Sequence, residues 1–205
     1  MRPNVWTLSL AVLVSSISYC HGCSCMQAHP QEHYCNSDFV ILARIKKEQI
    51  MESTASKVYK VRIRKEFKIS EKGLAALKSG KLHSAMSSAV CGVDLKVGKL
   101  YVISGTINSL RAQVNICNMI KEWNELSKRQ RKGLRMLYKR GCECKIKNCT
   151  FGWCSKSRPK DSCIWKSECE TRDGICLRQA HGSCMWNKNK QLTSCRSGVG
   201  ERPHS

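Results

Sequence analysis

The residues with the most evident chemical potential follow an apolar N-terminal segment, in the sequence Cys23-Ser24-Cys25. Cleavage before Cys23 would give this residue a free α-amine, whose reference pKa of about 7.7–8.0 leaves part of it neutral at physiological pH. A neutral amine and the carbonyl oxygen of the same residue can close a five-membered chelate ring on a metal ion. A catalytic zinc with three protein ligands keeps a further position open, and such a terminus could occupy it.

The cysteines and histidines are not expected to form a catalytic or metal site of the chain's own. A Cys–His nucleophile needs an activated thiolate, whereas an even number of cysteines in an oxidising compartment favours disulfides. The sequence therefore predicts a protein that is not an enzyme and has no cofactor of its own. The histidines are scattered without metal-ligand spacing, and one group of cysteines lacks the distant pair of a zinc ribbon: His29, His33, His83 and His181, and Cys142, Cys144 and Cys149.

The N-terminal segment, residues 1–22, has the pattern of a secretory signal peptide. An apolar stretch from Val5 to Ile17 is followed by small residues, Cys20 and Gly22, that suit a cleavage site. A membrane anchor is the alternative, but it needs roughly 20 apolar residues, and this stretch is shorter and contains serines. We therefore predict a secreted, extracellular protein without a membrane span.

The distribution of the cysteines predicts two domains. The 205-residue chain contains 15 cysteines, and removal of the leader takes away only Cys20, so an even number remains for disulfides. Residues 23–142 carry widely spaced cysteines and are long enough to bury a core. Residues 143–205 are cysteine-dense and too short and polar to fold without cross-links.

The chain is strongly basic, with 36 Lys and Arg against 15 Asp and Glu. Such a field attracts acidic polymers, and outside the cell these are sulfated glycosaminoglycans such as heparan sulfate rather than nucleic acid. A merely solvated surface is the alternative for each patch. The candidate polyanion-binding residues lie on a predicted strand and a predicted helix: Lys57, Lys60, Arg62 and Arg64, and Lys128, Arg129, Arg131 and Lys132.

Hydrophobic patterns predict a mainly β fold with flanking helices. Apolar residues alternate with polar ones between Tyr59 and Ile69, which is typical of a strand. Five short strands favour a closed barrel of the OB type. We expect strands over 39–45, 57–69, 82–86, 100–104 and 112–116, a helix over 30–36, and loops over 46–56 and 73–81.

A second helix is predicted from Ser127 to Arg140. Ser127 and Gln130 have the spacing of a capping box, and Gly141 is a suitable end. The residues beyond it show no clear periodicity, which is consistent with a small domain held by disulfides. The expected apolar stripe of the helix consists of Leu134, Leu137 and Tyr138.

Several blocks of this sequence, in order, resemble the tissue inhibitors of metalloproteinases. The first is Cys23-x-Cys25 followed by His29-Pro30-Gln31. The resemblance covers the whole mature chain and implies a netrin-like, OB-type inhibitory domain followed by a small disulfide-rich domain. The other blocks are Cys35–Asp38 with the strand 40–45, Ser88–Gly92, Gln130–Leu134, Gly141–Ile146 and Gly182–Trp186.

The resemblance also implies a set of disulfides. The family's pairing corresponds here to Cys23–Cys91, Cys25–Cys117, Cys35–Cys142, Cys144–Cys184, Cys149–Cys154 and Cys163–Cys176. Cys169 and Cys195 have no counterpart in the family, and we predict that they pair with each other.

By resemblance, the amine and carbonyl of Cys23 chelate the active-site zinc of a matrix metalloproteinase or a related zinc protease. Ser24 then enters the pocket beside the metal, and the following residues lie along the cleft. The implied contacts are Cys23, Ser24, Cys25, Met26 and Gln27, and Ser87, Ser88, Ala89 and Val90. The expected function is inhibition by a monomer.

Two questions stay open at this point. Gln27 stands where members of the family usually carry proline, which either loosens this segment or adds a hydrogen bond. The alternative function is that of a basic netrin-like module, which binds glycosaminoglycans or a cell-surface partner without inhibiting a protease.

Overall fold

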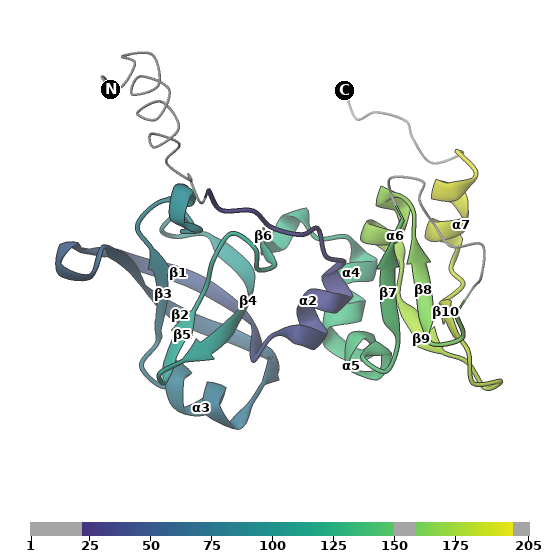
Figure 1. Cartoon of the computed structure of the whole chain (residues 1–205), viewed down its shortest axis with the longest axis horizontal. Helices are drawn as coiled ribbons and strands as arrows, with labels where there is room; N and C mark the ends of the chain where they lie inside the picture. The colour runs from purple at the N-terminus through teal and green to yellow at the C-terminus, as the bar shows by residue number, and fades with distance from the viewer. Residues whose placement is uncertain (1–21, 150–158, 199–205) are drawn as a thin grey trace, which may run out of the picture.

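The structure is a computed structural model, and it describes residues 22–149 and 159–198 (Figure 1). The predicted signal peptide, apart from Gly22, and the cysteine Cys154 of one predicted disulfide lie outside these residues. None of the helices in the described part is both long enough and apolar enough to cross a bilayer.

A closed β-barrel forms the first part of the molecule, as predicted. The sheet has the order β1-β2-β3-β5-β4-β6, and β1 also pairs with β4, which closes five of the strands into a ring. β6 pairs with the first half of β4 on the edge opposite β1, and β5 pairs with the second half of β4. The strands are β1 (Phe39–Met51), β2 (Ser56–Ile69), β3 (Lys81–Ala85), β4 (Leu100–Asn108), β5 (Arg111–Gln113) and β6 (Ile120–Glu122).

Strand β1 is apolar on both faces at its beginning because both faces are covered. Phe39, Ile41 and Ala43 point into the barrel core, while Val40 and Leu42 point into a second cluster beneath the helices. Side chains of a strand alternate between its faces, so a continuous apolar run is what a strand between two cores requires. β-Bulges in the pairing with β2 shift the register of that strand, and Phe67 thereby joins the second cluster.

Two segments predicted as loops are regular structure. The polar segment 46–56 mostly continues β1 and starts β2, so that the two strands project as a long hairpin, and only η1 (Glu52–Thr54) and Ala55 form the turn (Figure 1). The segment 73–81 contains most of helix α3 (Glu71–Leu77), which is capped by the Ser70 hydroxyl accepting from the Gly73 amide. The exposed end of the hairpin was missed because its side chains do not alternate between apolar and polar. The helix was missed because Gly73 lies in its first turn.

The predicted helix from Ser127 is present but is not uniform. It consists of α4 (Lys128–Lys132), a π-helical segment η4 (Gly133–Leu137) and α5 (Tyr138–Gly141). Ser127 and Gln130 form the expected capping box, with the Ser127 hydroxyl accepting from the Gln130 amide at 3.0 Å. The strand expected over 112–116 is shorter, and β6 with the adjacent η3 (Trp123–Glu125) was not expected.

The C-terminal part consists of two small sheets and two short helices. β7 (Lys145–Asn148) pairs in parallel with β8 (Ser162–Trp165), and β9 (Cys176–Arg178) pairs antiparallel with β10 (Cys184–Trp186). Helices α6 (Glu168–Asp173) and α7 (Lys190–Arg196) pack together. Disulfides Cys144–Cys184, Cys163–Cys176 and Cys169–Cys195 tie these elements.

The two parts share a hydrophobic cluster. Ile175 and Leu177 of the C-terminal part pack with Leu134 and Tyr138 from the helical segment before it. Helix α2 (Pro30–Asn36) lies between the barrel and the C-terminal sheets (Figure 1) and contributes Tyr34 to the same cluster. Burial of apolar surface therefore couples the predicted domains to each other.

Candidate functional site

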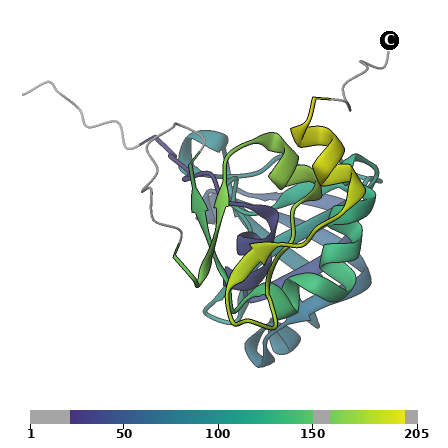
Figure 2. The same ribbon diagram turned by 90° about the vertical axis from the view of Figure 1, so that its right-hand side faces the viewer.

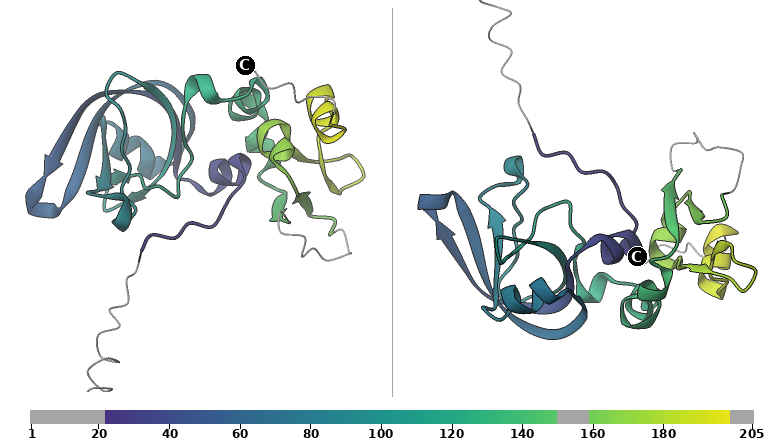
Figure 3. Two further views of the ribbon diagram at one scale, coloured as in Figure 1. Left: turned by 90° about the horizontal axis from the view of Figure 1, so that it is seen from above. Right: turned by 60° about the horizontal axis from the view of Figure 1, so that its bottom comes forward.

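The candidate site is an exposed edge made by two segments, Cys23–Gln27 and the loop Ser87–Val90. Figures 1 and 3 show the first segment running as an extended ribbon toward α2. The disulfide Cys23–Cys91 joins the two segments, and Cys25–Cys117 ties the first one to the loop after β5. The structure thus places Cys23 beside the loop, and the predicted contact residues after it continue along the extended segment. Met26 is 93% exposed and Val90 is 59% exposed, so the edge presents apolar side chains to solvent.

The loop owes its shape to a tight turn that sequence reasoning did not single out. Residues Ser88–Val90 form the 3-10 turn η2, and Cys91 follows in the left-handed region with φ 65°. The Gly92 amide donates to the Ser87 carbonyl at 2.7 Å. A Cβ on Gly92 would lie 2.2 Å from the Ala85 carbonyl oxygen, so only glycine permits this close approach of the chain.

The anchor of Cys25 is a second turn, built by two asparagines. The Asn115 amide donates to Asn118 Oδ1 at 2.8 Å, and the Cys117 amide donates to Asn115 Oδ1 at 3.0 Å. The Ile116 amide donates to the Cys91 carbonyl at 3.0 Å, which connects this turn to the other loop. Asparagine favours such turns because its side chain bonds the backbone two residues on, and the Asn-x-x-Asn spacing was a signal that could have been noticed.

The far end of the segment is fixed by His29, whose ring is buried. Its Nδ1 accepts from the Gln31 amide at 3.1 Å, which caps α2, and its Nε2 lies 2.9 Å from the Glu170 carbonyl. These partners require the neutral tautomer with the proton on Nε2. Burial is the main reason why the pKa of His29 falls from 6.5 to about 4. The ring contacts Trp165 and Trp186, at centroid distances of 5.8 and 5.2 Å.

Gln31 completes the attachment. Its carboxamide nitrogen donates to the carbonyls of Gly141 and Cys176, each at 2.9 Å, and its oxygen accepts from the Cys176 amide at 2.9 Å. The segment before α2 is therefore held at both ends, by disulfides at one and by buried hydrogen bonds at the other. Its middle, including Gln27, is exposed, and the Gln27 side chain makes no hydrogen bond to the described residues.

The sulfur atoms of Cys23, Cys25 and Cys117 lie within 4.8 Å of one another, but they are not suited to bind a metal. All three belong to disulfides, and a metal site needs thiolates. The donor groups that remain at this edge include the Cys23 carbonyl oxygen and, once the peptide bond to Gly22 is cut, the Cys23 nitrogen.

Comparison with known proteins bears directly on this edge. The model of the family described as "Tissue inhibitor of metalloproteinase" matches residues 21–186. The chain belongs to this family. The resemblance inferred from the sequence blocks is thereby confirmed. The match includes every residue of the candidate site and ends at β10, so α7 lies beyond it.

Individual members of the tissue inhibitor of metalloproteinase family are similar over most of their length. The "Tissue inhibitor of metalloproteinase" of Drosophila melanogaster is 29% identical over 96% of this chain and 98% of its own. "Metalloproteinase inhibitor 2" of Homo sapiens is 34% identical over 87% of each chain. "Metalloproteinase inhibitor 3" of Scyliorhinus torazame is 31% identical over 87% of this chain and 88% of its own.

The described cysteines of this member of the family pair as expected. The structure contains Cys23–Cys91, Cys25–Cys117, Cys35–Cys142, Cys144–Cys184 and Cys163–Cys176. It also contains Cys169–Cys195, as predicted. The remaining pair involves Cys154, which lies outside the described residues.

The predicted polyanion-binding residues do not form one surface. Lys57 is paired with Asp94 and Glu48, and Arg131 donates to the Trp123 and Asn124 carbonyls, so both are occupied within the molecule. Lys60, Arg62 and Arg64 are exposed on the outside of the barrel, where Lys60 pairs in register with Lys47 and Lys81. Lys128 and Lys132 are exposed on α4, and Arg129 is half-buried beside them.

Proposed function

We propose that this protein inhibits zinc metalloendopeptidases, matrix metalloproteinases and their relatives, through the edge formed by Cys23–Gln27 and Ser87–Val90. Membership of a family whose relatives are named metalloproteinase inhibitors supports inhibition in general. The observation that carries the proposal is the position of Cys23, which directly follows the predicted cleavage site and which a disulfide fixes on an exposed edge.

The mechanism follows from what these residues can do once the leader is removed. The Cys23 amine and carbonyl would chelate the catalytic zinc of the protease, in the position otherwise available to water. Because Cys23 and Cys25 are each disulfide-bonded, little conformational entropy is lost on binding. The Ser24 hydroxyl would enter the pocket next to the metal.

The remaining contacts would lie on both sides of this point. Cys25, Met26 and Gln27 would extend along the substrate cleft, while the loop of Ser88 and Ala89 would fill its other side. No peptide bond of the inhibitor would cross the metal, so the protease would have nothing to cleave. In this proposal the chain acts as a monomer, supplies no catalytic group and needs no cofactor of its own.

The decisive experiment changes only the terminus. The mature protein beginning at Cys23 is compared with a form carrying one extra alanine before Cys23, in a fluorogenic peptide assay with a matrix metalloproteinase. An extra alanine after Ser205 is the matched control. We expect the N-terminal extension to weaken inhibition at least about a hundredfold, because the nitrogen becomes an amide that no longer binds zinc.

Two results would contradict the proposal in different ways. Full inhibition by the N-terminally extended form would exclude chelation by Cys23 while leaving inhibition intact. Absence of inhibition by the unextended protein, across a panel of matrix metalloproteinases and disintegrin-type relatives, would leave the alternative of a binding module without inhibitory activity.

A further inference from the structure

A hollow lies between α4, α6 and α7, on the opposite side of α2 from the barrel. Its volume is about 670 Å³, which is in the size range of small-ligand sites. Figure 2 faces this side of the molecule, where α7 lies beside the helical segment that begins with α4. Cations from all three helices line the hollow: Lys128, Arg129 and Lys132 from α4, Arg172 from α6 and Lys190 from α7.

The positive charge in this hollow is not balanced by acidic residues. Asp173 is the one carboxylate among the lining residues, and it is already paired with Arg172 Nε at 2.9 Å. Within the described part of the chain, no carboxylate forms an ion pair with Lys128, Lys132 or Lys190. Like charges that converge on one concavity repel each other, and an anion placed there would relieve this repulsion.

Arg129 provides a second sign of a missing partner. Its Nη2 donates to Asn187 Oδ1 at 2.8 Å, whereas its buried Nε has no hydrogen-bond acceptor among the described residues. A buried donor without a partner costs free energy. Guanidinium groups offer paired N–H donors that match the geometry of tetrahedral oxyanions, and lysines add point charges around them.

The rest of the lining indicates a sugar rather than a peptide. Besides the charged residues it contains Gln191, Ser194 and Cys195, and it contains no aliphatic or aromatic side chain. A bound acidic peptide would normally find at least one apolar pocket for an anchoring side chain. Amide and hydroxyl groups beside cations are suited to the hydroxyl and sulfate groups of a sulfated oligosaccharide.

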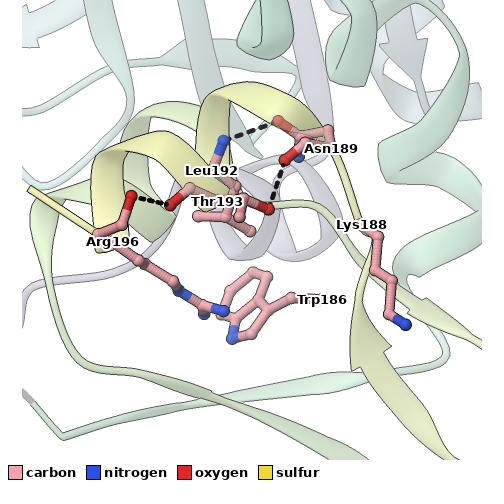
Figure 4. Close-up of a pocket in the computed structure, with 7 residues that line it drawn as sticks. Trp186, Lys188, Asn189, Leu192, Thr193 and Arg196 are labelled. Atoms are coloured by element: carbon pink, nitrogen blue, oxygen red, sulfur yellow. Dashed lines mark hydrogen bonds between the residues drawn. The ribbon is translucent and has the colours of Figure 1, made fainter. Parts of the chain in front are cut away.

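Helix α7 is held firmly enough to act as a wall of the hollow. Cys169–Cys195 links it to α6, and the Arg196 guanidinium pairs with buried Glu170 at 2.6 Å. Figure 4 shows the other side of the same helix, where Asn189 caps its start and Leu192 points inward. Asn189 Oδ1 accepts from the Leu192 amide at 2.9 Å.

We propose that the hollow between α4, α6 and α7 is a binding site for a short sulfated segment of a glycosaminoglycan. The site combines the cationic face of α4 with α7 and the Cys169–Cys195 disulfide. Helix α4 and Cys169 lie within the family match, whereas α7 and Cys195 lie beyond it. It is separate from the row of Lys47, Lys60 and Lys81, which are exposed on the outside of the barrel. The proposal does not depend on protease inhibition.

The test uses the mature protein and a heparin tetrasaccharide, with affinity measured by titration calorimetry at physiological and at doubled salt. The double variant Lys132→Gln/Lys190→Gln should weaken binding about tenfold, and a higher salt concentration should weaken binding to the unchanged protein. The comparison variant, Lys60→Gln/Arg62→Gln, removes the same charge from the rival candidate patch on the barrel and should weaken binding clearly less than the first variant does.

A third variant tests the shape of the site at constant charge. Cys169→Ser/Cys195→Ser keeps every cation but releases α7, and it should also weaken tetrasaccharide binding severalfold, with circular dichroism verifying that the fold is retained. If this variant fails to fold, the comparison of the two charge variants decides. Equal losses in both charge variants, a larger loss in the barrel variant, or tighter binding of an acidic hexapeptide than of the tetrasaccharide would each overturn the proposal.

Discussion

The side chain of Gln31 forms a reciprocal pair of hydrogen bonds with the backbone of Cys176, 145 residues further along the chain. The carboxamide nitrogen donates to the Cys176 carbonyl, and the carboxamide oxygen accepts from the Cys176 amide, both at 2.9 Å. Gln31 belongs to α2, shortly after the candidate inhibitory segment, while Cys176 belongs to β9. The pair therefore couples the position of the candidate edge to the C-terminal part.

Replacing Gln31 with methionine should destabilise the protein. Methionine fills a similar volume but leaves the Gly141 carbonyl and both backbone groups of Cys176 without this partner. Since each buried unsatisfied group costs about 1–3 kcal/mol, we expect a loss of roughly 2–5 kcal/mol in the free energy of unfolding, measured with urea. Gln27→Met is the matched control, because that side chain is exposed and makes no hydrogen bond to any described residue. Equal stability of the two variants would show that the Gln31 network contributes nothing.

His29 should make stability fall at acidic pH. Burial lowers its folded-state pKa to about 4, from an ordinary value of 6.5. Between these values the unfolded chain takes up a proton that the folded chain does not, so the contribution of His29 is complete above about pH 6.5 and is lost as pH falls to about 4. The full effect approaches about 3 kcal/mol.

The neighbouring titratable groups also contribute to this profile. Burial also lowers the pKa of His33 and raises that of Glu32. Burial would raise the pKa of Glu170, but hydrogen bonds from Ser167 and Arg196 outweigh it and lower the value. The free energy of unfolding, measured with urea, should differ less between pH 7 and pH 4.5 for His29→Asn than for the unchanged protein. Asparagine preserves the cap of α2. The exposed control His181→Asn should show the same pH dependence as the unchanged protein. If His29→Asn also shows that same pH dependence, His29 does not cause the loss of stability at acidic pH.

Met26 should contribute to inhibition and not to folding. Its side chain is 93% exposed on the proposed edge, so its truncation leaves the core intact while removing apolar contact with the protease. For Met26→Ala we expect about a tenfold higher inhibition constant and an unchanged melting temperature. Met136→Ala, at a 57% exposed position of η4 away from the edge, should change neither quantity. Similar inhibition constants for the two variants would remove Met26 from the contact surface.

Two arginine–glutamate pairs should differ in strength because only one carboxylate is buried. The Glu170 side chain is 3% exposed in its pair with Arg196, whereas the Glu143 side chain is 67% exposed in its pair with Arg178. We expect Arg196→Gln to cost roughly 1–3 kcal/mol, a value reduced by the exposure of Arg196 itself. Arg178→Gln should cost less than about 1 kcal/mol. Thermal unfolding of both variants provides the comparison, and a larger loss for Arg178→Gln would contradict it.

The barrel was predictable because the hydrophobic pattern of its strands matches the pattern of buried and exposed side chains. The alternation from Tyr59 to Ile63 and the apolar run from Phe39 to Ile45 each correspond to a strand at the observed position. Helix α3 was missed because Gly73 is a poor helix former. Glycine nevertheless suits this position, because the Cβ of any larger residue would lie only 3.1 Å from the Ile69 side chain and 3.2 Å from the Ser70 hydroxyl.

The residues of the edge were predicted as a set, but the reason why they stand together was not. Their exposure follows from the turns at Cys91 and Cys117. A hydrogen bond from the Ile116 amide to the Cys91 carbonyl joins these two turns, which are distant in the sequence. The π-helical segment was equally hidden. Tyr138 lies so close to Gly133 that a Cβ on this glycine would be 2.5 Å from the ring. Such packing depends on the whole fold, and no local pattern records it.

The three disulfides of the first part of the chain have a consequence for how the molecule responds to a cut in its backbone. Cys23, Cys25 and Cys35 all precede the barrel hairpin, and their partners Cys91, Cys117 and Cys142 all follow it. A backbone cut anywhere between Asn36 and Val90, including the exposed tip at Glu52–Thr54, leaves two pieces that remain covalently joined at three points. The nicked molecule would keep Cys23 attached, through Cys91, to the loop Ser87–Val90.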